Sequence, residues 1–185
     1  MSGFTGNIVL CGFMGCGKSS VGRRLAKVMG REFVDLDSYI EKQQGCTVRE
    51  IFDRDGEEGF RELEARAVRE IAQKGGMVVA CGGGTVLFER NIRAFRQAGS
   101  VILLLDVPLP LLHARLKHDT RRPLLQVEDR DAVIDKLYRQ RIGKYRRACD
   151  LRVRSTRPPW VMARRIAEMA EDFGPQTLKK EAHHG

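Results

Sequence analysis

The sequence predicts an α/β fold in which a parallel sheet carries helices on both faces. Short apolar runs alternate with longer segments of helical periodicity along the chain, which is the pattern of repeated strand–helix units. A glycine-rich segment joins the first apolar run to the first helical segment, at the position where such sheets bind ligands. The chain has 185 residues and no internal repeat, so one domain with a full core accounts for it.

The expected elements follow from these periodicities. We expect strands, mostly short and apolar as in buried parallel sheets, at Ile8–Cys11, Glu32–Asp35, Met77–Cys81, Val101–Leu105 and Leu151–Val153. We expect helices at Lys18–Met29, Ser38–Gln44, Thr47–Phe52, about Glu57–Lys74, Asn91–Gln97, Leu109–Lys117, Asp131–Arg147 and Pro159–Phe173. The resulting domain covers residues 1–174, and the loss of apolar periodicity predicts an unstructured tail at residues 175–185.

Composition and charge argue against several classes of protein. No apolar run approaches the roughly 18 residues of a membrane span, and the N-terminus lacks the pattern of a secretion signal, so we expect a cytoplasmic protein without a membrane partner. Five cysteines without a C-x-x-C pair indicate reduced thiols. The net charge of +9 suits anionic small ligands. Because the basic residues are dispersed and aromatic residues are few, we do not expect nucleic acid as a partner.

The glycine-rich segment from Gly12 to Ser19 reads GFMGCGKS and has the G-x-x-x-x-G-K-[ST] spacing of a P-loop. Glycines let backbone N–H groups surround phosphate oxygens. Lys18 can then reach the β- and γ-phosphates of a nucleoside triphosphate, and the Ser19 hydroxyl can ligate Mg²⁺. The expected ATP contacts of this segment are Gly12, Met14, Gly15, Cys16, Gly17, Lys18, Ser19 and Ser20.

Two carboxylates, Asp35 and Asp37, follow the second expected strand. If this segment is extended, alternation directs both side chains toward the ligand edge of the sheet. Asp35 could then hold Mg²⁺ while Asp37 orients an acceptor hydroxyl or takes its proton. The same spacing also allows a helix N-cap pair before Ser38.

Arginines supply candidate contacts to an acidic acceptor. Arg61 and Glu64 lie three residues apart on one helical face, so the carboxylate can brace a guanidinium that binds a substrate carboxylate. Alone, such a pair is most often a surface salt bridge. Arg141 could be the second arm of the clamp.

Two loops complete the predicted site. Gly82–Gly84 directly follow the third expected strand, where their backbone can approach a ligand closely, although a flexible turn would also fit. The basic stretch around Arg121 and Arg122 predicts a lid that brings an arginine to the γ-phosphate and excludes water.

Taken in order, these segments resemble the shikimate kinase family. The resemblance rests on GFMGCGKSS, Asp-Leu-Asp, FRELE, Gly-Gly-Gly, RPLL and Arg-x-x-x-Tyr and runs from about residue 7 to residue 173. It implies a three-layer P-loop kinase fold with a five-stranded parallel sheet, a substrate-binding subdomain at about residues 35–64 and a lid at about residues 115–127. It also implies transfer of the γ-phosphate of ATP, with Mg²⁺, to the 3-hydroxyl of shikimate in aromatic amino-acid synthesis.

The resemblance also assigns roles to individual residues. Asp37 resembles the carboxylate that holds the acceptor hydroxyl, and Asp35 resembles its partner near the metal. Arg122 matches the lid arginine on the transferring phosphate. The shikimate contacts implied are Asp37, Arg61, Gly82, Gly83, Gly84 and Arg141, and the further ATP contacts are Arg115, Arg122 and Arg157. The chain departs from the family pattern at Gly143 and Lys144, where Pro and Leu are common.

Two alternatives stay open from the sequence. One is another small-molecule kinase of the same fold, resembling gluconate kinase, because gluconate also has a carboxylate. The other is a catalytically inactive protein that senses nucleotides. The presence of Asp37 and Arg122 favours an active kinase, which we expect to act as a monomer.

Overall fold

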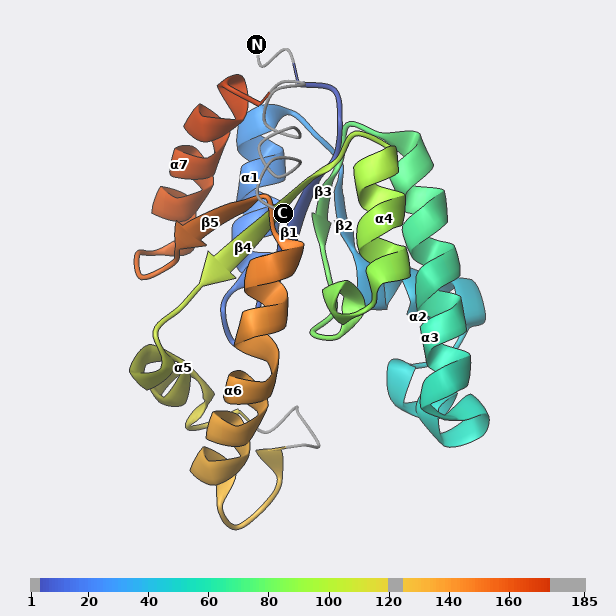
Figure 1. The fold of residues 1–185 in the computed structure, drawn as a ribbon, viewed down its shortest axis with the longest axis vertical. Coiled ribbons are helices and arrows are strands. Elements are labelled where there is room, and N and C mark those ends of the chain that lie inside the picture. The colour runs from blue at the N-terminus through green and yellow to red at the C-terminus, as the bar shows by residue number, and fades with distance from the viewer. Residues whose placement is uncertain (1–3, 120–124, 174–185) are drawn as a thin grey trace, which may run out of the picture.

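A computed structural model describes residues 4–119 and 125–173 of the chain and confirms the α/β prediction. The sheet has five parallel strands in the order β2-β3-β1-β4-β5 (Figure 1). The strands are β1 Ile8–Cys11, β2 Phe33–Asp35, β3 Val78–Ala80, β4 Val101–Asp106 and β5 Leu151–Arg154. Each expected strand is therefore present, with its bounds shifted only slightly at either end.

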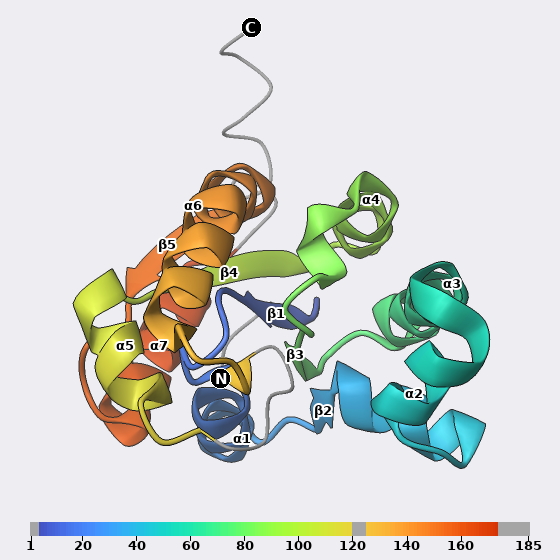
Figure 2. The same ribbon diagram turned by 90° about the horizontal axis from the view of Figure 1, so that it is seen from below.

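Helices cover both faces of this sheet. In the described part of the chain they are α1 Lys18–Met29, α2 Leu36–Gln44, α3 Val48–Lys74, α4 Glu89–Gln97, α5 Leu109–Leu116, α6 Arg130–Ala148 and α7 Pro159–Glu171, with a short 3₁₀ turn at Thr85–Leu87. Figure 2 shows α1 and α7 on one face of the sheet and α4 and α6 on the other. The arrangement has the three layers that alternating strands and helices predict.

The core lies around the central strands. Every residue of β1 is fully buried, and so are most residues of β4. Both strands read as continuous apolar runs because helices exclude water from both faces of a parallel sheet. The P-loop and the loop after β3 therefore extend from a rigid, closely packed base.

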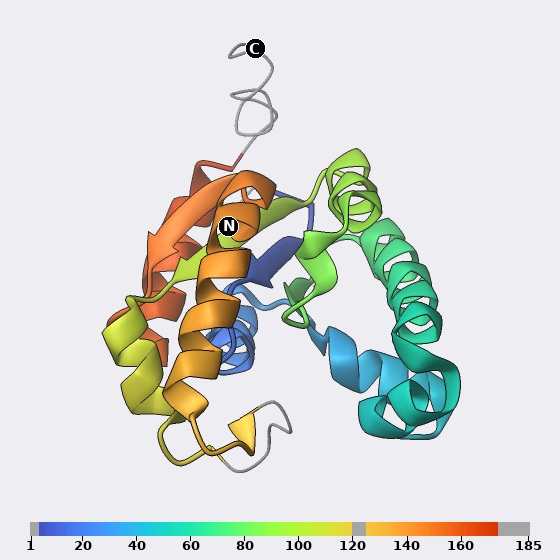
Figure 3. The same cartoon turned by 60° about the horizontal axis from the view of Figure 1, so that its bottom comes forward.

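Two helical arms extend beyond the carboxyl ends of the strands. Figure 3 shows α2 and α3 on one side, and α5 with the N-terminal half of α6 on the other. On the second arm, His113 of α5 contacts two carboxylates of α6: Nδ1 lies 2.9 Å from Asp131 Oδ1, and Nε2 lies 2.7 Å from Asp135 Oδ1.

The first arm confirms one prediction of local structure and corrects another. The two expected helices at Thr47–Phe52 and Glu57–Lys74 are the two segments of α3, which meet at a kink where Gly56 leaves the helical conformation (φ 69°, ψ −175°). This is a left-handed φ that glycine adopts without strain. Thr47 and Glu50 form a capping box at the start of α3. Helix α2 starts at Leu36, so the segment from Asp35 to Asp37 is not extended, and the alternation argument is wrong.

A buried asparagine fixes the first arm to the sheet. Asn7, just before β1, donates from Nδ2 to the carbonyl oxygen of Ile71 at 3.1 Å and accepts at Oδ1 from the Met77 N–H at 2.9 Å. Asn7 is fully buried, so these bonds form where water cannot compete. They connect the end of α3 to the start of β3.

Candidate active site

The P-loop follows β1 and includes the first two residues of α1. Gly12, Gly15 and Gly17 have φ values of 138°, 76° and 94°, which side chains would strain. Lys18, the first residue of α1, donates from Nζ to the carbonyl oxygens of Gly12 at 2.9 Å and Phe13 at 3.2 Å. The ammonium group therefore lies over the loop, where backbone N–H groups and the α1 N-terminus favour phosphate.

A pocket of about 410 Å³ opens beside this loop. Arg115 borders it and donates from Nη1 to the carbonyl oxygens of Gly15 at 3.3 Å and Cys16 at 3.4 Å, and from Nη2 to that of Ser155 at 3.3 Å. The lining residues are Gly15, Cys16, Gly17, Ser20, Val21, Arg115, Ser155, Thr156, Arg157, Pro158 and Pro159.

The pocket brings together six of the predicted ATP residues, from the P-loop, from α5 and from the loop after β5. The predicted P-loop residues that do not line it are Gly12, Met14, Lys18 and Ser19. The lining by Ser155, Thr156, Pro158 and Pro159 was not predicted. Their position after a strand's carboxyl end was the only available signal.

Ser19 and Asp35 form the candidate metal site. Ser19 Oγ donates to Asp35 Oδ2 at 2.6 Å, and Asp35 Oδ1 accepts from the Ser38 N–H at 3.4 Å as the N-cap of α2. The N-cap alternative is thus confirmed for Asp35. A P-loop hydroxyl beside a carboxylate is the protein part of a Mg²⁺–nucleotide site. Within residues 4–119 and 125–173 there is no cluster of three His, Cys, Asp or Glu residues that could hold a metal alone.

Asp37 lies in the first turn of α2, close to other carboxylates. Burial raises the pKa of Asp37 from its ordinary 3.8 to about 6, with additional increases from the charges of Asp35 and Glu64. A carboxyl group with a pKa slightly below neutrality is mostly ionised at physiological pH and can still accept a proton. Desolvation thus suits Asp37 to act on an acceptor hydroxyl.

The three glycines after β3 face the three predicted substrate side chains, one each. A Cβ atom at Gly82 would lie 2.7 Å from Asp37 Oδ1, one at Gly83 would lie 3.6 Å from Arg141 Nη1, and one at Gly84 would lie 2.5 Å from Arg61 Nη2. A side chain at Gly82 or Gly84 would therefore displace the end of the Asp37 or the Arg61 side chain. The strip Gly82–Gly84 is a backbone surface bordered by one carboxylate and two guanidinium groups.

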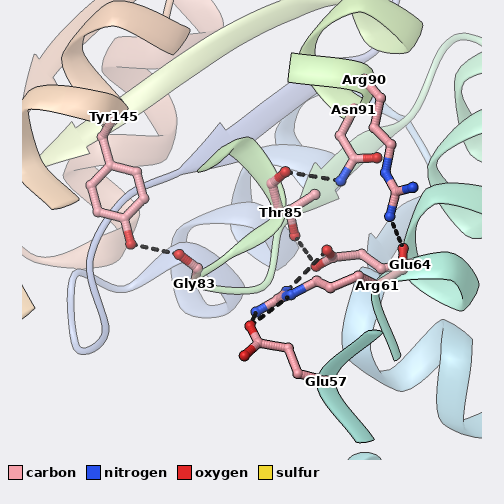
Figure 4. A network of polar contacts seen from close by, with 8 residues as sticks. All are labelled: Glu57, Arg61, Glu64, Gly83, Thr85, Arg90, Asn91 and Tyr145. Atoms are coloured by element: carbon pink, nitrogen blue, oxygen red, sulfur yellow. Dashed lines mark hydrogen bonds and ion pairs between the residues drawn. The ribbon is translucent and has the colours of Figure 1, made fainter. Parts of the chain in front are cut away.

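The orientation of Arg61 is fixed by a buried network (Figure 4). Arg61 Nη1 donates to Glu64 Oε2 at 3.0 Å, as the helical spacing predicted. Glu64, with a side chain only 1% exposed, also accepts at Oε1 from Thr85 Oγ1 at 2.8 Å. Asn91 Nδ2 in turn donates to the Thr85 carbonyl oxygen at 2.9 Å. Sequence reasoning missed Thr85 and Asn91, because neither belongs to a recognisable motif.

On the opposite side of the glycine strip, Tyr145 of α6 fixes the loop. Burial raises the pKa of Tyr145 to about 12, so the phenol stays protonated and its OH donates to the Gly83 carbonyl oxygen at 2.6 Å. Arg141 lies one helical turn before Tyr145. Helix α6 runs unbroken through Gly143 and Lys144, so the departure from the family pattern leaves the helix intact. Arg122, predicted to contact the transferring phosphate, lies outside the described residues, as does the expected tail.

A P-loop whose lysine lies near a buried carboxylate at the edge of a parallel sheet places the chain in the class of P-loop kinases of small molecules. Within that class the chain belongs to the shikimate kinase family. The family model described as Shikimate kinase matches residues 14–171, which confirms the resemblance.

Individual relatives agree with this family. A shikimate kinase of Synechococcus elongatus is 39% identical over 95% of this chain and 90% of its own length. The structure of a shikimate kinase from Acinetobacter baumannii in complex with shikimate superposes with a TM-score of 0.82 at 34% identity, covering 89% of this chain and 92% of that one. A gluconokinase from Sinorhizobium meliloti, at 18% identity and a TM-score of 0.52 over 90% of this chain and 95% of that one, shares the fold alone. The chain is therefore an ATP-dependent kinase of the shikimate kinase family.

Proposed function

We propose that the chain transfers the γ-phosphate of ATP to the 3-hydroxyl of shikimate and releases shikimate 3-phosphate and ADP. The observation that carries this proposal is the glycine strip Gly82–Gly84 with Asp37, Arg141 and Arg61 facing it residue by residue. A flat, carboxylated, hydroxylated ring can lie on that strip. Its carboxylate then meets the two guanidinium groups, which bind carboxylates in planar, bidentate geometry, and a hydroxyl meets Asp37.

Asp37 orients the acceptor hydroxyl and takes its proton. Its pKa of about 6 leaves it ionised near neutral pH, so no prior deprotonation step is needed. The transition state of phosphoryl transfer is loose in most analyses, so positioning contributes more than strong base catalysis. Arg61 and Arg141 supply that positioning by fixing the far end of the ring.

The remaining groups act on ATP. Lys18 balances charge on the β- and γ-phosphates, and the loop glycines donate backbone N–H groups to them. Ser19 and Asp35 would hold Mg²⁺, which neutralises phosphate charge when bound. Arg115 and Arg157 border the pocket of about 410 Å³ that suits the adenosine part. We assign Arg122 to the transferring phosphate by its match to the family motif.

The same proposal extends to the organisation, the oligomeric state and the location of the protein. Residues of about 35–64 form the shikimate-binding subdomain, and residues of about 115–127 form the lid. The protein acts as a monomer in the cytoplasm, with ATP and shikimate as its ligands. None of the described helices combines the length and the apolar character needed to cross a bilayer.

The test is release of ADP from MgATP by the purified chain with shikimate, gluconate, a nucleoside monophosphate or no acceptor. We expect strong stimulation by shikimate alone. Equal stimulation by gluconate would favour a broader small-molecule kinase. No stimulation by any acceptor, with ATP binding intact, would contradict the proposal and favour a nucleotide sensor.

A further inference from the structure

The donors of Arg61 are divided between two carboxylates of α3. Nη1 donates to Glu64, whereas Nε and Nη2 donate to the single oxygen Oε1 of Glu57, at 3.4 and 3.3 Å (Figure 4). Nε–H and the adjacent Nη–H form the edge of a guanidinium that binds carboxylates in bidentate geometry. Glu57 therefore contacts the edge of Arg61 that would otherwise be open to a carboxylate ligand.

The other contacts of Arg61 leave few positions on its guanidinium group where an incoming carboxylate could bind. The rings of Phe60 and Phe88 lie 5.2 and 5.0 Å from Arg61 Cζ, so aromatic groups cover part of the guanidinium plane. Glu64 is buried and also holds Thr85, so its contact with Nη1 is fixed. The edge that Glu57 contacts is the part of Arg61 that can change partners.

Glu57 differs from Glu64 in how firmly it is held. The Glu57 side chain is 69% exposed, and it borders an open hollow together with Glu58 and Arg90. The left-handed φ of Gly56 interrupts α3 immediately before Glu57, and the i,i+4 spacing then places Glu57 over Arg61. Exposed pairs of this kind are weak, so a substrate carboxylate can displace Glu57.

We propose that Glu57 is an internal competitor of the substrate carboxylate. It orients the Arg61 guanidinium before substrate binds, gives up its contact when the carboxylate arrives, and so weakens the affinity for carboxylate ligands. This inference rests on the proposed function, since it takes Arg61 as a shikimate contact. Glu57 is then a positioning residue that acts through Arg61 and tunes substrate affinity.

The test compares Glu57→Gln with the matched control Glu58→Gln. Glu58 is the neighbouring exposed glutamate on the same hollow, so both variants remove one negative charge just after the kink in α3. Isothermal titration gives the Kd for shikimate and for its methyl ester, which lacks the carboxylate charge. Because exposed ion pairs contribute little, we expect Glu57→Gln to bind shikimate about 2- to 5-fold more tightly. The ester should show no such gain, and Glu58→Gln should bind both ligands as the unmodified chain does.

Three outcomes would overturn the inference. Equal gains in Glu57→Gln and Glu58→Gln would indicate a general effect of charge. An equal gain for the ester would indicate that the carboxylate is not the competing group. Unchanged or weaker shikimate binding in Glu57→Gln would show that Glu57 does not compete, or that it supports Arg61 in the complex.

A readout without shikimate separates this inference from the proposed function. Phenylglyoxal modifies accessible arginines, and peptide mass spectrometry can follow its reaction at Arg61. We expect a several-fold faster reaction in Glu57→Gln and an unchanged rate in Glu58→Gln. Faster reaction together with no shikimate binding by any variant would refute the proposed function but retain the Glu57–Arg61 competition. Equal reaction rates in all variants would refute the competition itself.

Discussion

Replacing Asp37 by asparagine should slow turnover and stabilise the fold at the same time. Burial and the neighbouring carboxylates raise the pKa of Asp37 from 3.8 to about 6, so the folded state disfavours the ionised form. The stability associated with this group is fully present below pH 3.8 and is lost as the pH rises through about 6. A shift of this size corresponds to about 3 kcal/mol as an upper limit, and the amide of an asparagine side chain avoids this cost because it carries no charge.

Urea denaturation of the nucleotide-free protein at two pH values measures this effect. Asp37→Asn should raise the free energy of unfolding by roughly 1 to 3 kcal/mol near pH 7.5 and by much less near pH 4. The matched control is Asp53→Asn, because Asp53 is exposed on α3. Turnover in Asp37→Asn should fall by at least ~10²-fold. ATP binding should persist, as followed by the fluorescence of the single tryptophan, Trp160, which directly follows the pocket-lining residue Pro159 in the sequence. A variant that is less stable near pH 7.5, or equally stabilised at both pH values, would refute the reasoning.

Three further variants test other contacts. Gly82→Ala places a Cβ 2.7 Å from Asp37 Oδ1, so steady-state kinetics should show kcat lower by on the order of 10²-fold with the KM for MgATP little changed; a normal kcat would contradict the tight fit. Gly143→Ala adds a helix-favouring methyl group that meets only Arg147 Nη1, at 3.5 Å, whereas Gly22→Ala meets the Phe33 ring at 2.6 Å. Thermal denaturation should therefore show stabilisation by about 0.5–1 kcal/mol in Gly143→Ala and destabilisation in Gly22→Ala. Partial desolvation lowers the pKa of His113, but hydrogen bonds to Asp135 and Asp131 raise it more, so the net shift is upward. The hydrogen bonds of His113 contribute fully to the free energy of unfolding below about pH 6.5, the pKa of histidine in the unfolded chain. This contribution is lost as the pH rises through the higher pKa of His113 in the folded state. The stability deficit of His113→Gln should accordingly be larger near pH 6 than near pH 9, and equal deficits at both would rule this out.

Much of the fold could be predicted from the sequence because its signals are local. The apolar runs of β1 and β4 are continuous because both strands are buried on both faces, and the P-loop glycines follow β1 directly. The Arg61–Glu64 contact was also predictable, since residues three apart on a helix are neighbours. In each case the interacting groups lie within one element or at its end.

What the sequence did not reveal depends on contacts between distant segments or on where one element starts. Thr85 and Glu64 are 21 positions apart, and Tyr145 and Gly83 are 62 apart, so only the folded sheet edge brings them together. The carboxylates of Asp35 and Asp37 were expected side by side on an extended segment. Instead, β2 is only three residues long and α2 begins at Leu36, because Asp35 caps the helix. The roles proposed for Asp35 and Asp37 were therefore first argued from an incorrect local geometry.

The Arg61–Glu64 pair has a consequence for how variants of this kinase can be interpreted. Arg61 is 16% exposed and neutralises a carboxylate that is almost fully buried, and removing one partner of such a pair leaves an isolated charge that typically costs about 3–5 kcal/mol. Loss of Arg61 would thus lower the amount of folded protein in a cell before any catalytic defect is measured. A growth-based screen would score substitutions at Arg61 as inactive whether they lower the amount of folded protein or weaken the proposed binding of the acceptor. Protein abundance must be measured alongside growth to separate a chain that cannot bind its acceptor from one that is degraded.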